Sequence, residues 1–277
     1  MERRIRHGCG ALALGLLLTV GCTAGGDEAD DGSGGGEVLE AGEGDGLGIV
    51  LDADRLPVNR AQAVELAETI VARPETFGPG FVEVPDRDDD PGHWAVLDEN
   101  CVWVRETVPD EVLASLTGYA ELPAEEGAGP LGVTAVVTVH RDARSAEWQM
   151  AGTVEDALRC PDQQLRPDEW VSGLISLGMG FGEIGNFFAE DFLTETGSFH
   201  SGEAGGPHDF EWMRARLGPL TVAVSAKGAE GRTREEVTEA ATRASGLMLS
   251  RAETELAGEP VGIDEGDGTD EGEGKKR

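Results

Sequence analysis

Four cysteines are the residues of this chain whose chemistry depends most on where they lie. Cys22 closes a short apolar run, residues 12–22, which ends in Val-Gly-Cys. Arginines precede the run, and Gly21 offers the small side chain that signal cleavage requires. The pattern predicts an export signal over residues 1–21, removed so that Cys22 becomes the first residue.

The Val-Gly-Cys ending resembles a bacterial lipobox, in which the thiol of the last cysteine carries diacylglycerol, although Thr19 stands where that motif most often has leucine. We therefore expect a lipidated (palmitate-type) Cys22 and a stable membrane anchor. Two or more acyl chains bind a membrane stably, whereas a single chain binds it only marginally. The apolar run is shorter than the ~20 residues that a spanning helix needs. An ordinary secretory signal with a free Cys22 thiol, or a cytosolic protein, stays open, as does twin-arginine export.

Cys101 and Cys160 are left as a pair in the exported chain. In an oxidising compartment an even pair predicts a disulfide, worth about 4 kcal/mol by the loop-entropy model. Two free thiols are the alternative. A zinc site is disfavoured because neither cysteine has a ligand partner at metal spacing.

Two acidic or histidine-rich clusters could bind a cation. One comprises His200, Glu203, His208 and Asp209; the other comprises Asp86, Asp88, Asp89 and Asp90. The first matches no helical ligand pair, and the second lacks the glycine and terminal glutamate of a calcium loop. Both are interpreted as solvated loops, so no metal site is predicted.

Other motifs that could carry chemistry are weak. Residues 180–185 fit Gly-x-Gly-x-x-Gly, but no convincing helix follows, so no cofactor is predicted. Nucleophile signatures of serine hydrolases are absent from the sequence, whereas paired carboxylates stay open among 54 acidic residues. We interpret the five tryptophans as core residues rather than as the walls of a ligand site. No catalytic residue is predicted.

Composition separates the chain into four parts. The net charge of −32 disfavours nucleic acid as a partner through long-range repulsion. Residues 23–48 hold ten glycines and eight acidic residues, which predicts a disordered tether behind Cys22 over residues 22–48. The tail, residues 258–277, has the same character. Residues 49–257 then form a single folded domain.

Within residues 49–257, helices and strands are mixed. Helices are expected at residues 59–72, 110–116, 144–158 and from 233, the last with a Thr233–Glu236 capping box. Strands are expected at residues 81–84, 94–97, 101–104, 133–139 and 221–226, with a turn at 77–80. For segment 170–177 both a strand and a short helix remain possible.

This order predicts an α+β fold, a mostly antiparallel sheet with helices packed on one face. Residues 210–217 and 221–226 should pair as a hairpin around Gly218 and Pro219. Gly-Pro-Leu precedes a strand and a helix twice, at residues 129–131 and 218–220, so two related halves are expected, with chance similarity as the alternative.

The order of these features resembles actinobacterial lipoproteins of Streptomyces type: lipobox, acidic tether, a Leu-Asp-Glu-Asn-Cys-Val-Trp stretch (residues 97–103), a strand, a helix ending in Cys160-Pro161, then the Gly-Pro-Leu strand and final helix. It is more distantly similar to the extracellular sensor domains of mycobacterial Ser/Thr kinases, which are α+β. Those domains usually carry two disulfides, whereas this chain has cysteines for one.

The resemblance implies extracytoplasmic ligand sensing. With the anchor and tether, it leads to the expectation of a non-enzymatic, lipid-anchored binding domain at the extracytoplasmic face of the cell membrane. Its partner would be an unknown small ligand or an envelope protein. Two alternatives are kept, a cell-envelope hydrolase and an assembly lipoprotein without a ligand.

Overall fold

The computed structural model describes residues 50–85, 90–180, 182, 186 and 188–257. The predicted signal, tether and tail, with Cys22, lie outside these residues and stay predictions. No helix in the described part of the chain is both long and apolar enough to cross a membrane.

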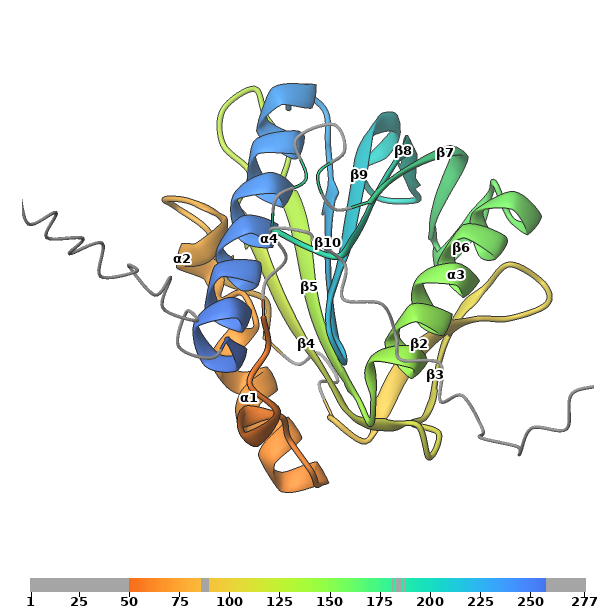
Figure 1. Ribbon diagram of the computed structural model, residues 1–277. Coiled ribbons are helices and arrows are strands. Elements are labelled where there is room, and N and C mark those ends of the chain that lie inside the picture. The colour runs from red at the N-terminus through yellow and green to blue at the C-terminus, as the bar shows by residue number, and fades with distance from the viewer. Residues whose placement is uncertain (1–49, 86–89, 181, 183–185, 187, 258–277) are drawn as a thin grey trace, which may run out of the picture. The chain divides into compact units, whose positions relative to one another are not determined.

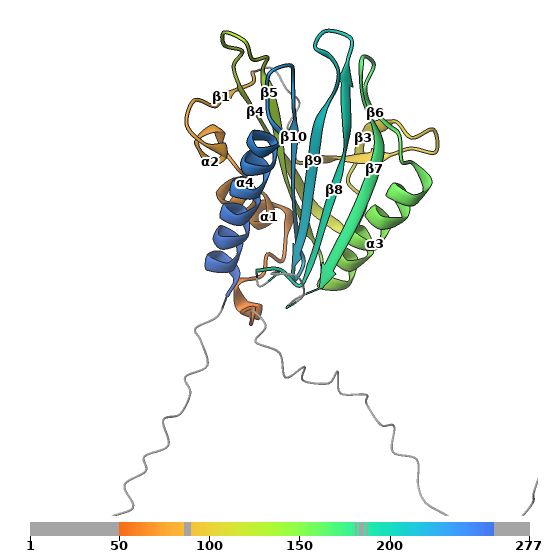
Figure 2. The ribbon, with the colours of Figure 1, turned by 90° about the horizontal axis from the view of Figure 1, so that it is seen from above.

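An eight-stranded antiparallel sheet forms the centre of the fold, in the order β1-β4-β5-β10-β9-β8-β7-β6 (Figure 2). Its strands are β1 Val82–Glu83, β4 Val112–Leu122, β5 Leu131–His140, β6 Gln163–Arg166, β7 Glu169–Gly180, β8 Asp191–Ser201, β9 Gly205–Leu217 and β10 Leu220–Lys227. A separate hairpin consists of β2 His93–Leu97 and β3 Trp103–Thr107. The predicted mostly antiparallel α+β fold is confirmed.

The sheet lies between helices (Figure 1). The helical segments are η1 Ala53–Arg55, α1 Arg60–Ile70, α2 Pro74–Phe77, α3 Ala143–Arg159 and α4 Arg234–Leu256. In β10, Val222 and Val224 are buried in the core that includes α1 and α4. Thr221, which precedes Val222 and points to the opposite face, instead donates a hydrogen bond from Oγ1 to Gln149 of α3 (2.6 Å). Helices α1, α2 and α4 thus share one face of the sheet, which we call the α4 face. Helix α3 lies on the other, the α3 face, in contrast to the expected packing of the helices on a single face.

Local signals explain how most elements begin. The Asn59 side chain accepts a hydrogen bond from the Gln62 backbone and starts α1. Thr233 and Glu236 form the expected reciprocal capping box of α4. Four of the apolar α4 positions are alanines, which bring the helix close to the β9 and β10 strands. Leu247 lies outside this buried face of α4 and is 45% exposed.

The helix expected at residues 110–116 is wrong, since these residues enter strand β4. β4 pairs with β5 almost from end to end, so tertiary pairing overrides the weak helical preference that Pro109 suggests. A Cβ at Gly118 would approach the carbonyl oxygen of Ala72 to 2.8 Å, so glycine permits close packing there. The expected turn at 77–80 is preceded by the short helix α2, and Gly80 (φ +88°) follows it.

The repeated Gly-Pro-Leu pattern leads to two neighbouring strands. β5 and β10 pair antiparallel at the middle of the sheet, with Thr221 opposite Thr138. The β9–β10 hairpin around Gly218 and Pro219 is confirmed. The helices after β5 and β10 lie on opposite faces, however, so a two-fold axis through the sheet does not relate the two strand–helix segments.

Candidate functional site

A cleft of about 460 Å³ opens between α3, the β2–β3 hairpin and the α3 face of the sheet. A smaller cavity of about 60 Å³ lies beneath it and shares Trp94, Trp103, Thr153 and Arg214 with its lining. The volume of the cleft is in the range of small-molecule sites. It is our candidate functional site.

Aromatic side chains form the walls of the cleft and the cavity beneath it. Trp94 and Trp103 come from the β2–β3 hairpin, Trp148 from α3 and Trp212 from β9. Trp148 is 67% exposed, and the other three are half-buried. The interpretation of the tryptophans as core residues holds for Trp212, which packs against the buried cluster that includes Phe199 and Phe210, and is wrong for the exposed Trp148. The fifth, Trp170, is exposed and stacks on His200 with ring centroids 5.0 Å apart.

Arg214 of β9 forms the floor. Its guanidinium carbon lies 3.8 Å from the ring centroid of Trp212 and 5.6 Å from that of Trp103, a cation–π arrangement. The side chain is only 13% exposed. Burial lowers the pKa of Arg214, whereas the charges of Glu195 and Asp156 raise it; a guanidinium stays protonated in either case.

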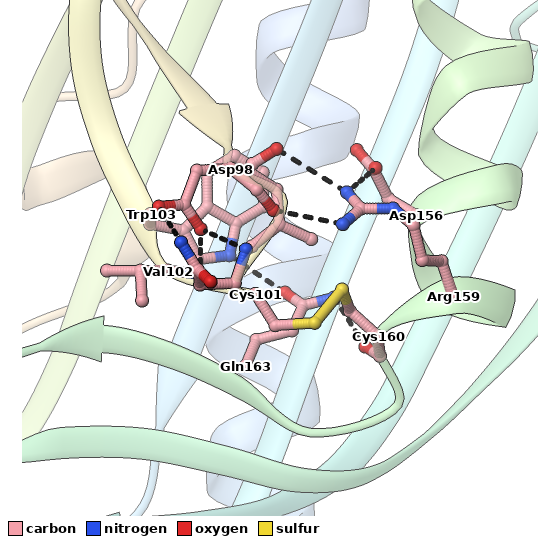
Figure 3. Close-up of a disulfide and its surroundings, with 10 residues drawn as sticks. Asp98, Cys101, Val102, Trp103, Asp156, Arg159, Cys160 and Gln163 are labelled. Carbon is pink, nitrogen blue, oxygen red and sulfur yellow. Dashed lines mark hydrogen bonds and ion pairs between the residues drawn. A yellow bond between two sulfur atoms is a disulfide. The ribbon is translucent and has the colours of Figure 1, made fainter.

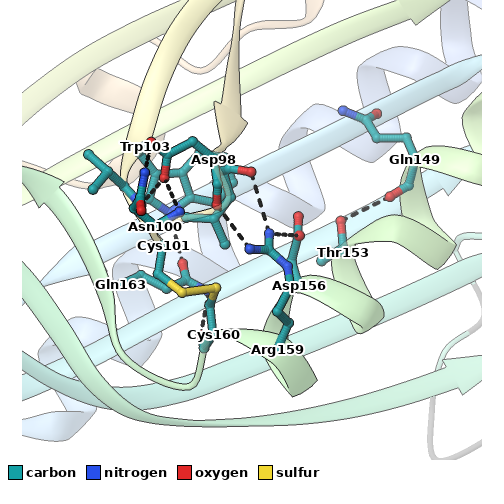
Figure 4. A network of polar contacts seen from close by, with 12 residues as sticks. Asp98, Asn100, Cys101, Trp103, Gln149, Thr153, Asp156, Arg159, Cys160 and Gln163 are labelled. Carbon is teal, nitrogen blue, oxygen red and sulfur yellow. Dashed lines mark hydrogen bonds and ion pairs between the residues drawn. A yellow bond between two sulfur atoms is a disulfide. The ribbon is translucent and has the colours of Figure 1, made fainter.

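Hydrogen bonds connect this floor to α3. Arg214 Nη1 donates to Thr153 Oγ1 (2.7 Å), and Thr153 Oγ1 donates to the Gln149 carbonyl (3.0 Å; Figure 4). The Gln149 Oε1 atom lies 2.8 Å from His140 Nε2 and accepts from Thr221. The network fixes the inner side of α3 against β5, β9 and β10.

His140 is the titratable histidine of the cleft. It is 2% exposed, and burial lowers the pKa of its ring, although the Gln149 hydrogen bond and Asp142 oppose that shift. The ring is therefore neutral at pH 7. Its Nδ1 atom is buried and has no hydrogen-bond partner among the described residues.

The predicted disulfide is confirmed and joins two walls of the cleft. Cys101 lies in the β2–β3 turn and Cys160 caps the end of α3 (Figure 3). Asp98 organises the turn, since its Oδ1 accepts from the Val102 backbone (2.9 Å). Arg159 of α3 donates to the Asp98 carbonyl (2.9 Å), so a polar contact reinforces the covalent one.

The other candidates from the sequence lie away from the cleft. His208 Nε2 donates to the Ala204 carbonyl (2.9 Å), and Asp209 pairs with Arg234 (2.6 Å). His200 contacts Ser172 Oγ through Nε2 (2.9 Å). No group of three or more potential ligands that could hold a metal occurs in the described ranges.

Two further candidates are only partly described. Residues 86–89 lie outside the described part, and Asp90 contacts His93 Nδ1 (3.0 Å) and the Gly92 backbone. Of the glycine-rich segment 180–185, positions 181 and 183–185 also lie outside it. Strand β7, which ends at Gly180, pairs antiparallel with β8, whereas a dinucleotide site requires a βαβ unit.

Sequence reasoning missed the polar residues of the cleft. The signal that could have found them is the two-residue period of β9, which places Trp212, Arg214 and Arg216 on one face. On α3, Ser145, Gln149 and Thr153 recur every four residues and face the sheet side. Polar stripes on the inner faces of two elements indicate a polar hollow between them.

Neither a protein-family model nor a curated protein matches the sequence. Among solved structures, the extracellular domain of PknH from Mycobacterium tuberculosis is similar, with a TM-score of 0.38 and 11% identity over 71% of this chain and 99% of that chain. The similarity is weak and concerns the fold alone, so it assigns neither a ligand nor an activity.

Proposed function

We propose that this protein is a binding domain that holds a small ligand in the cleft under α3, and that Cys22 anchors it by lipid to the extracytoplasmic face of the cell membrane. The single observation that carries the binding function is the cleft itself, with aromatic walls and a few polar groups converging on its floor. Ligand sites combine these features, because apolar walls supply affinity and polar groups fix orientation.

The disulfide and the acidic tether sequence support the proposed location. Disulfides persist outside the cytosol, and the Cys101–Cys160 bond joins the β2–β3 hairpin to the end of α3. A flexible coil of 26 residues spans roughly 28 Å, enough to hold the domain off the membrane.

The binding experiment uses N-phenyl-1-naphthylamine, a neutral aromatic probe that becomes fluorescent in apolar sites. Excitation of tryptophan should give saturable probe emission. Trp148→Ala should weaken binding by about tenfold, since an aromatic pair contributes up to about 1.5 kcal/mol. Trp170→Ala is the matched control, because Trp170 is also exposed but lies outside the cleft. Binding that Trp148→Ala leaves unchanged would exclude this cleft as the site.

The anchor has a separate experiment. Cells grown with an alkyne fatty acid should label the protein, and Cys22→Ala should abolish the label. Cys101→Ser serves as the control, because it removes another cysteine and should keep the label. Equal labelling of wild type and Cys22→Ala would refute lipidation at this residue.

The hydrolase alternative has one pair of groups to examine. Ser172 Oγ and His200 Nε2 lie 2.9 Å apart on β7 and β8. Neither lines the cleft, and no described carboxylate is hydrogen-bonded to His200. Nucleophilic catalysis also needs a group that orients the histidine, so this pair does not favour a hydrolase over a binding domain.

A further inference from the structure

The geometry points to the chemical class of the ligand, and this inference rests on the proposed binding function. We propose that the cleft binds a small monoanion with an apolar or aromatic body, whose anionic oxygen contacts Arg214 on the floor while its body lies between the tryptophans. The contacts of Arg214, its neighbours on β9 and the lining of the cleft carry this assignment.

Arg214 has a charge that the fold pairs incompletely. A guanidinium has five N–H donors, and the described side chains offer Arg214 one hydrogen bond, to Thr153. Nε is buried and has no hydrogen-bond partner among the described residues. The nearest carboxylate oxygen, on Glu195, lies 3.9 Å from Nε, beyond hydrogen-bonding distance. Arg214 lines the cleft, where its remaining N–H donors can meet an acceptor from a ligand, and such a charge-assisted hydrogen bond gains free energy.

Arg216 shows what full pairing looks like on the same strand. It follows Arg214 by two residues and faces the same side of the sheet. It donates to both Asp191 and Glu190, and Glu147 lies 3.9 Å from Nη1. The chain thus supplies carboxylate acceptors to Arg216. At Arg214 no described carboxylate lies within hydrogen-bonding distance, so a ligand can supply the acceptor.

The rest of the cleft suits an apolar body. Above Arg214, the lining includes Trp94, Trp148, Val96, Leu97 and Pro109. Three carboxylates limit the charge of the ligand: Glu195 next to Arg214, and Glu111 and Asp156 in the lining, of which Asp156 pairs with Arg159 (2.8 Å). Their repulsion disfavours a second negative charge, so a monoanion fits better than a dianion.

The net charge of −32 opposes an anion only at long range. At physiological ionic strength, exposed charges are screened beyond about 8 Å, so contacts inside the cleft decide the affinity. The long-range repulsion acts on the encounter rate instead. Added salt should therefore raise the association rate of an anionic ligand.

The experiment compares two probes with the same aromatic body. 1-Anilinonaphthalene-8-sulfonate carries one negative charge, and N-phenyl-1-naphthylamine is its neutral counterpart. The full chain should bind the anion about tenfold more tightly, the effect of one charge-assisted hydrogen bond. Arg214→Met should remove this preference, so that the variant binds the two probes with about equal affinity.

Matched variants separate local from global charge. Arg243→Met makes the same change in net charge on exposed α4 and should keep the preference. Glu195→Gln removes the competing carboxylate, can retain the contact with Ser176 (2.8 Å) and should strengthen binding of the anion alone.

Each outcome has one meaning. If both probes bind wild type equally in the cleft, the monoanion class is overturned and the binding function stands. If neither probe binds, the proposed binding function fails. If Arg214→Met does not fold, as near-ultraviolet circular dichroism would show, Glu195→Gln decides: an unchanged preference for the anion overturns the role of Arg214.

Discussion

The strongest single test of the cleft is removal of the disulfide, by the double variant Cys101→Ser/Cys160→Ser. The bond joins positions 59 residues apart in sequence, so its loss should cost about 4 kcal/mol in the loop-entropy model. Domains of this size typically have a free energy of unfolding of about 5–15 kcal/mol, and each kcal/mol lost lowers the melting temperature by about 2–4 °C. The variant should therefore fold at 25 °C and melt about 8–16 °C lower.

At 25 °C the loss of the bond should weaken probe binding even though the variant stays folded. Without the bond, hydrogen bonds still connect the hairpin to α3 and β6, among them Arg159 to the Asp98 carbonyl (2.9 Å), Gln164 to the Cys101 carbonyl (2.8 Å) and Trp103 to Gln163 (2.8 Å). Each contributes about 1 kcal/mol. Since Trp94 and Trp103 are on this hairpin, its loosening should weaken N-phenyl-1-naphthylamine binding by tenfold or more.

Calorimetry gives the melting temperature and probe titration gives the affinity, both at pH 7.5. Wild type treated with a phosphine reductant is the control and should reproduce the variant. A lower melting temperature with unchanged affinity would refute the view that the bond holds the wall of the cleft. If neither quantity changes, the disulfide does not form in the protein.

Two further predictions concern stability. The unfolded chain protonates His140 near pH 6.5, whereas burial lowers the pKa of the folded ring, so the free energy of unfolding should fall as the pH drops below about 6.5. Urea titrations should show that His140→Asn loses less of this free energy between pH 7.5 and 5.5 than the wild type does. Gly118→Ala should cost about 1–3 kcal/mol, because the new Cβ would lie 2.8 Å from the Ala72 carbonyl oxygen; Gly152→Ala, where a Cβ meets nothing within 4 Å, is the control, and equal melting temperatures would contradict the prediction.

The parts of the fold that the sequence predicts are those that depend on neighbours along the chain. Asn59 and Thr233 cap helices through contacts with residues three positions away, and Gly218-Pro219 turns the hairpin. The disulfide follows from counting the cysteines that remain in an exported chain. Strand β4 could not be predicted in this way, because it is stabilised by pairing with β1 and β5, which local propensity does not reflect.

The cleft was beyond sequence reasoning for the same physical reason. Arg214 contacts Trp103 of β3, Thr153 of α3 and Glu195 of β8, so its environment comes from three segments besides its own strand. The tryptophans look like core residues by composition, and only the position of α3 on the second face shows that they line a hollow. Residue types alone do not distinguish the two roles.

The register between β8 and β9 explains why two arginines of one strand differ, and it supplies the last prediction. Asp191 lies opposite Arg216, whereas Leu193 lies opposite Arg214, and Glu195 is displaced to the position opposite Trp212. Leu193→Glu should place a carboxylate directly across from Arg214, where cross-strand pairs of opposite charge attract. Arg214 would then be paired like Arg216 and have no need of an anion from outside.

The readout is again the pair of probes. Leu193→Glu should lose the roughly tenfold preference for 1-anilinonaphthalene-8-sulfonate and still bind N-phenyl-1-naphthylamine. Leu193→Met is the control for the altered shape of this buried side chain, and it should keep the preference. A Leu193→Glu protein that folds and still prefers the anion would show that incomplete pairing of Arg214 does not select the ligand, since the cross-strand carboxylate would then have satisfied the guanidinium without effect.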